Sequence, residues 1–221
     1  MSVLRDKNPK DHMGWSPLSE AAKYGHKNIC KLIMNNIEDK NPKDISWTTP
    51  LHEAARIGHV QVCKIIIDEL SDKNPVNQIG RTPLHFAVVY NHDRICKLII
   101  FQVKDKNPSD KEGTTPLHTA AFKGHEKVFQ FIFGEIQDKN PKDQDGWTPL
   151  HFAAAQGQNS NSVCSSKSSF FSQSTIFQTF FRQLFDSYLL LFLSVEKENK
   201  LLIGLKQDFF FSVSQLKNEN K

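Results

Sequence analysis

Apolar residues recur at helical spacing along the first 157 residues of the chain. Leu18, Ala21 and Ala22 stand at i, i+3 and i+4, which places their side chains on one face of a helix. A second apolar run follows a few residues later at i, i+4 and i+8. Its members in the first three copies are Ile29, Ile33 and Ile37; Val62, Ile66 and Leu70; and Ile95, Ile99 and Val103. The pattern predicts two short helices that repeat along the chain.

The repeat length is 33 residues, and polar signals mark where each unit begins. A proline recurs at this spacing without exception, and a serine or threonine precedes it each time. The hydroxyl of such a residue caps a helix, and proline fits the first helical position because its missing N–H would have no partner there. The predicted caps are Ser16, Thr49, Thr82, Thr115 and Thr148, and the prolines are Pro17, Pro50, Pro83, Pro116 and Pro149.

Each predicted helix also has a stop signal. A left-handed glycine is expected to end the first helix in four copies, and Asn91 takes that place in the third copy. The sequence Asp-Lys-Asn-Pro is expected to end the second helix, because the residue before proline disfavours the helical conformation. Such a unit cannot bury its apolar face alone, so neighbouring units are expected to stack. The stop glycines are Gly25, Gly58, Gly124 and Gly157.

These motifs resemble the ankyrin repeat, whose period is 33 residues and whose signature is T-P-L-H-x-A. The matching segments read TTPLHEAA, RTPLHFAV, TTPLHTAA and WTPLHFAA, and DKNPKD is similar to the family's D-V-N-A-K-D. The resemblance covers residues 6–157. It implies an all-α solenoid of helix–turn–helix units with β-turn fingers and a concave binding face.

The resemblance divides the chain into a repeat array, residues 1–157, and a non-repeat tail, residues 158–221. Two departures from the family pattern stand out. Trp47 occupies a finger position that holds glycine in the other copies, so it is expected to be strained if that position needs a positive φ. The usual Gly-Ala is missing after the second helix, which leaves the end of that helix open by a few residues. The expected units are 14–46, 47–79, 80–112, 113–145 and the half unit 146–157.

Three interpretations of the tail stay open. The repeat breaks in mid-unit, which favours a read-through or mispredicted end. Alternatively, aromatic residues at helical spacing predict an amphipathic helix over 176–195 that could cap the stack. The third interpretation is membrane attachment, but the uncharged run 187–195 is far shorter than the roughly 20 residues that a span needs.

The composition excludes several classes of protein. A net charge of +4 without a Lys/Arg-rich run is too weak for a nucleic-acid-binding surface. The first twelve residues lack the apolar core of a signal peptide. Four cysteines do not make a disulfide framework, so a reducing compartment is expected, cytoplasmic or also nuclear.

No catalytic or metal-binding motif is predicted. The signature histidines sit in identical settings, and the resemblance implies that each one bonds across the turn or to the neighbouring finger. His26 with Cys30 could place two metal ligands on one helix face, as could its copies, but each pair lacks two further ligands for zinc. The chain is therefore expected to be neither an enzyme nor a cofactor-binding protein. The signature histidines are His52, His85, His118 and His151.

The positions that vary between copies are the candidates for binding. The resemblance implies that finger and first-helix positions contact a partner, and these positions hold the aromatic and arginine side chains that contact hot spots favour. The predicted partner-binding residues are Trp15, Tyr24, Arg56, Arg81, Tyr90, Phe122 and Trp147. Apolar residues beside them, such as Ile45, Ile57 and Ile79, would form a patch if they were contiguous.

The leading hypothesis is a monomeric, non-enzymatic scaffold that binds another protein through this face. One alternative is a fragment of a larger ankyrin protein, such as a regulatory subunit, a channel or an acyltransferase, without its effector domain. Another is an adaptor attached to a membrane through the tail.

Overall fold

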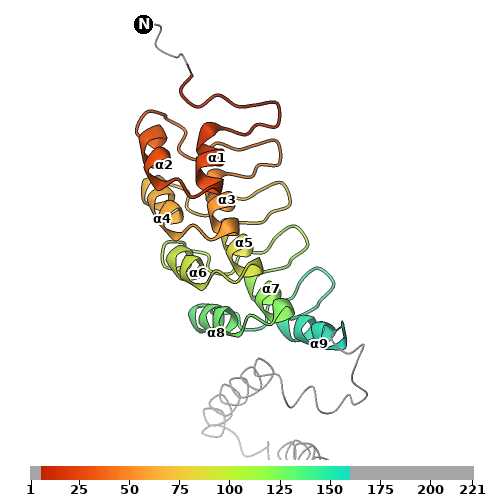
Figure 1. The fold of residues 1–221 in the computed structure, drawn as a ribbon. Helices are drawn as coiled ribbons and strands as arrows, with labels where there is room; N and C mark the ends of the chain where they lie inside the picture. The colour runs from red at the N-terminus through yellow and green to blue at the C-terminus, as the bar shows by residue number, and fades with distance from the viewer. Residues whose placement is uncertain (1–5, 160–221) are drawn as a thin grey trace, which may run out of the picture. The chain divides into compact units, whose positions relative to one another are not determined.

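The computed structural model describes the backbone of residues 6–159 and the side chains of residues 6–155. In this part of the chain nine α-helices follow one another, joined by turns and loops (Figure 1). The predicted all-α repeat fold is confirmed, while residues 160–221, which include the expected helix over 176–195, lie outside the described residues. The helices are α1 (Pro17–Lys23), α2 (Lys27–Met34), α3 (Pro50–Ile57), α4 (Val60–Glu69), α5 (Pro83–Val89), α6 (Asp93–Ile100), α7 (Pro116–Lys123), α8 (Glu126–Glu135) and α9 (Pro149–Asn159).

The helices form two columns. The first helices of the units, α1, α3, α5, α7 and α9, contact one another in chain order, and so do the second helices α2, α4, α6 and α8. Figure 1 shows the fingers projecting beside the first-helix column, on the side away from the second helices. The core lies between the columns, where Leu51, Leu84, Cys63 and Cys96 are fully buried.

The threonine–proline pairs begin the first helices. Thr49 is the N-cap of α3 and Pro50 is its first residue; Thr82 and Pro83, Thr115 and Pro116 occupy the same places in α5 and α7. Each cap is completed by the histidine three residues on. The backbone N–H of Thr49 donates to Nδ1 of His52 at 3.2 Å, and the Thr49 hydroxyl lies 2.9 Å from the same nitrogen. Thr148 contacts His151 in the same way at 3.2 and 2.8 Å.

The Asp-Lys-Asn-Pro segment joins three parts of the structure. The Asp39 carboxylate accepts from the N–H of Asn41, and the Asn41 side chain accepts from the N–H of Leu51 at the start of the next helix. Lys40 donates to the carbonyl of Met34, the last residue of α2. A cation at a helix C-terminus satisfies an orphan carbonyl and the helix dipole together. The repeated motif therefore closes one helix and positions the next.

The second helices end earlier than their apolar runs, and the predicted stop of α9 was wrong. Ile37 and Val103 lie beyond α2 and α6, and Leu70 is the C-cap of α4, because the chain turns away early to reach the next finger. Gly157 does not stop α9, which continues to Asn159. Glycine allows the left-handed conformation without forcing it. In the other copies a histidine follows the stop residue and begins the second helix, whereas Gln158 stands at that position here.

Candidate partner-binding face

An exposed row of large side chains runs across the ends of three first helices. Tyr24 is the C-cap of α1, Ile57 is the last residue of α3, and Tyr90 is the C-cap of α5. They are 33 residues apart and are 60%, 41% and 50% exposed. We call these three residues the first-helix row. The stack presents them together because neighbouring first helices lie side by side.

The fingers add a second group of exposed apolar side chains. Met13, Ile45, Trp47 and Ile79, here called the tip cluster, are each between 43% and 53% exposed. Backbone hydrogen bonds join the fingers that carry them: Ile45 donates to Met13 at 3.1 Å, and Gln78 donates to Ser46 at 2.9 Å. The cluster therefore lies on three adjacent fingers that are joined through their backbones. The fourth and fifth fingers carry Lys111 and Glu112, then Gln144 and Asp145, at the equivalent positions.

Three of the predicted partner-binding residues are exposed aromatics. Tyr24 stacks on His26 and Tyr90 stacks on His92, with ring centroids 6.2 and 6.4 Å apart. Trp147 is 45% exposed at the fifth finger, where its ring lies 5.9 Å from that of His151. These side chains are held in place and still present most of one face to solvent.

The two predicted arginines are already paired within the stack. Arg56 donates to the Glu53 carboxylate through Nη2 and Nε at 2.7 and 3.1 Å. This hydrogen bond raises the pKa of Arg56, and the hydroxyl of Tyr90 adds to the rise. Arg81 donates through Nε to Asp110 at 3.1 Å. Arg56 is therefore paired within α3, and Arg81 links the third finger to the fourth, before any partner arrives.

Two other predicted residues are partly packed. Phe122 is half-buried and meets Phe152 edge-to-face at 6.3 Å, so it contributes to the contact between α7 and α9. Trp15 is half-buried beneath Lys23, whose Nζ lies 5.0 Å from the Trp15 ring and 5.2 Å from that of Tyr24. Lys23 thus links the first finger to the first-helix row.

Comparison with known families matches most of the described chain. The family described as Ankyrin repeats (3 copies) matches residues 39–108 and 95–164, and the family described as Ankyrin repeat matches residues 13–45. The chain belongs to the ankyrin-repeat family. A search of curated proteins finds no match to it.

Three of the four signature histidines bond to the next finger of the ankyrin array. Nε2 of His52 lies 3.0 Å from the carbonyl of Arg81, and His85 and His118 reach the carbonyls of Thr114 and Trp147 at 3.2 and 3.0 Å. A carbonyl only accepts, so Nε2 carries the proton and Nδ1 is free to accept from the threonine. Burial lowers the pKa of His52 and of His85 to about 4, and lowers that of His118. These rings are neutral structural ties.

A second set of histidines makes a tie that the sequence did not indicate. His59, His92 and His125 are the N-caps of α4, α6 and α8. Their Nε2 atoms reach back 36 residues to the carbonyls of Lys23, Arg56 and Val89, at 2.9, 3.1 and 3.3 Å. The Ile-Gly-His, Tyr-Asn-His and Lys-Gly-His segments were the available signal, because the ring follows the stop residue in each of these copies.

The cysteines that stand four residues after His26, His59 and His92 are core residues. Cys30, Cys63 and Cys96 are free thiols and fully buried, and burial raises their pKa to about 11, 12 and 12. Thiols with so high a pKa are poor nucleophiles and poor metal ligands. Across residues 6–159 no group of three or more His, Cys, Asp and Glu side chains is placed to hold a metal ion.

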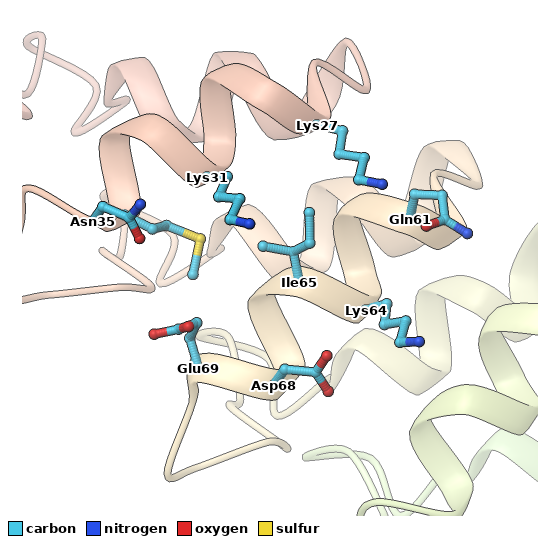
Figure 2. Close-up of a pocket in the computed structure, with 9 residues that line it drawn as sticks. Lys27, Lys31, Asn35, Gln61, Lys64, Ile65, Asp68 and Glu69 are labelled. Atoms are coloured by element: carbon cyan, nitrogen blue, oxygen red, sulfur yellow. The ribbon is translucent and has the colours of Figure 1, made fainter.

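A groove of about 340 Å³ lies between α2 and α4, in the second-helix column (Figure 2). Lys27, Lys31 and Lys64 line it together with the carboxylates of Asp68 and Glu69. Figure 2 shows Ile65 among these charged side chains, where it is half-buried. The groove is mixed in charge and shares no residue with the fingers. Within the described helices, none is both long enough and apolar enough to cross a membrane.

Proposed function

We propose that this ankyrin array is a non-enzymatic module that binds a partner protein through its fingers and first helices. The observation that carries the proposal is the first-helix row, Tyr24, Ile57 and Tyr90. These residues repeat at one position of three consecutive units, where they are exposed rather than packed. Large apolar side chains held in line on a rigid support are typical of contact hot spots.

The energetics of this face favour recognition by a preformed surface. Covering an exposed aromatic or large aliphatic side chain contributes about 2 kcal/mol. The row is fixed by its neighbours. Tyr24 stacks on His26 and Tyr90 stacks on His92, and His92 is also bonded to the carbonyl of Arg56 in the preceding unit. Little ordering entropy is then lost when a partner binds. The binding part is assigned to residues 1–157, in the five units expected from the sequence.

The test is affinity capture with the tagged full chain from a lysate of the source organism. In the test variant Tyr24, Ile57 and Tyr90 are changed to alanine. The matched control changes Ile29 and Leu32 on α2 to alanine, because these side chains are equally exposed but belong to the second-helix column. We expect a protein that the wild type and the control capture and the test variant loses, at unchanged helicity by circular dichroism. Equal capture by all three chains would refute the proposal.

A further inference from the structure

Trp47 adopts a backbone conformation that its residue type disfavours. Its φ is +62°, and it is one of two residues other than glycine with a positive φ in the described part of the chain. The equivalent positions of the other fingers hold Gly14, Gly80, Gly113 and Gly146, with φ between +79° and +81°. A side chain in this region is strained, and such strain persists where the surrounding structure imposes it, often at binding sites.

Crowding between fingers makes a side chain at this position harder to accommodate. A Cβ added to Gly80 would lie 2.8 Å from the backbone nitrogen of Lys111, and one added to Gly113 would lie 2.7 Å from that of Gln144. Even so, Trp47 fits while the adjoining bond from Gln78 to Ser46 stays at 2.9 Å. The indole is half exposed, so packing within the stack does not account for a tryptophan here.

Exposed apolar residues and cations share the first three fingers with Trp47. Met13, Ile45 and Ile79 are the other members of the tip cluster. Lys43 places Nζ 5.1 Å from the Trp47 ring centroid, and Lys10 donates to the carbonyl of Lys43 at 2.8 Å. Neither lysine pairs with a carboxylate among the residues that the structure describes.

The carboxylates next to these lysines in the sequence, Asp11 and Asp44, accept hydrogen bonds within their own finger turns. Asp11 accepts from the backbone N–H groups of Met13 and Trp15 at 2.9 and 2.8 Å. Asp44 accepts from those of Ser46 and Thr48 at 2.7 and 2.8 Å. Lys43 and Lys10 therefore have no carboxylate partner within the described residues, and a binding partner can supply the negative charge.

We infer that Trp47 anchors a segment of the partner protein that presents a large apolar side chain next to aspartate or glutamate. The apolar side chain covers Trp47 and its neighbours in the tip cluster, and the carboxylate meets Lys43 and Lys10. This inference rests on the proposed function and names the chemistry of its partner. A nucleic acid is disfavoured, because two cations neutralise few phosphates and three of the four tip residues are aliphatic rather than aromatic.

The test probe is a random dodecapeptide library displayed on phage and selected on the immobilised full chain. We expect the enriched peptides to combine a large apolar residue with Asp or Glu, and to bind Trp47→Gly and Trp47→Ala at least about tenfold more weakly than the wild type. The Ile29→Ala/Leu32→Ala control is expected to bind like the wild type. Basic enriched peptides, undiminished binding to both Trp47 variants, or competition by a single-stranded oligonucleotide would overturn the inference.

The same pair of variants tests the strain. Glycine normally destabilises a chain relative to alanine, because it has more freedom in the unfolded state. At Trp47 the order is expected to reverse, with Trp47→Gly melting roughly 2–4 °C above Trp47→Ala. A glycine variant that melts below the alanine variant would show that the position is unstrained and would remove this support for the anchor.

A further variant separates the two proposals. Peptides that lose binding to the Tyr24→Ala/Ile57→Ala/Tyr90→Ala chain but not to the Trp47 variants would overturn the anchor and leave the binding face in place. Peptides that keep their affinity for all these variants, or a library from which nothing is enriched, would count against both.

Discussion

At the residue scale, Gly58 is constrained twice: its backbone is left-handed, and a neighbouring side chain leaves no room for a Cβ. It is the C-cap of α3, with φ +104°. A Cβ on it would lie 2.7 Å from the imidazole of His92, the ring that ties α6 to the end of α3. Gly124 caps α7 in the same left-handed region at φ +69°, but no described atom lies within 4 Å of an added Cβ.

These two glycines give a matched pair of substitutions. Gly124→Ala is expected to cost about 1–2 kcal/mol of unfolding free energy, from the left-handed backbone alone. Gly58→Ala carries the same cost and displaces the His92 ring, which adds about 1–3 kcal/mol. Urea unfolding of both variants beside the wild type measures the difference. Equal losses would mean that the His92 ring gives way freely.

At the scale of elements, histidine side chains add hydrogen bonds between neighbouring units, whose helices pack through apolar faces. Nε2 of His52 bonds to the finger that follows, and Nε2 of His92 bonds to the first helix that precedes. In the capping box Nδ1 of His52 accepts from Thr49, so protonation of that nitrogen would break the cap. The capping box of α3 therefore requires a neutral His52.

This requirement predicts a stability that depends on pH. His52 and His85 have a pKa of about 4 in the folded chain, below the ordinary value of 6.5. The unfolded chain binds more protons between these values, so stability is full above pH 6.5 and falls as the pH drops toward 4. Each histidine contributes about 1.4 kcal/mol of loss per pH unit.

Urea unfolding between pH 7 and pH 4.5 measures this decline. His52→Gln is expected to be less stable at pH 7, because it loses the tie to Arg81, and to show a shallower decline. Ile29→Ala serves as the control and is expected to keep the slope of the wild type. A His52→Gln chain with the full wild-type slope would show that the ring is not held neutral.

At the scale of the whole array, each unit is stabilised by its neighbours, so position in the stack matters. Ile29 on α2 is 48% exposed, whereas the equivalent Ile95 on α6 is fully buried. Among the described helices, the second-helix column places α2 against α4 only, while α6 contacts both α4 and α8. Stability in such arrays is a sum over units and the contacts between them.

Hydrogen exchange followed by mass spectrometry tests this dependence on position. The amides of α6 are expected to exchange at least about tenfold more slowly than those of α2, after correction for intrinsic rates. The two helices have the same length, eight residues, which makes the comparison fair. Equal protection would mean that the array opens as one cooperative unit.

The sequence alone determined the repeat, its period and the starts of its helices, because caps, prolines and helical periodicity act within a few residues. It also determined that Trp47 stands in place of glycine. It did not determine the ends of the second helices or of α9, because those ends depend on contacts with the next unit and on a histidine that α9 lacks.

Only the tertiary structure decided which variable side chains form a surface. It placed Tyr24, Ile57 and Tyr90 in one row and gathered the tip cluster on the first three fingers, whereas Arg56 and Phe122 were found engaged within the stack. It also showed that His59, His92 and His125 bond to carbonyls 36 residues earlier in the chain. The physical reason is distance along the chain: local signals fix local structure, while exposure and pairing are set by residues that only stacking brings together.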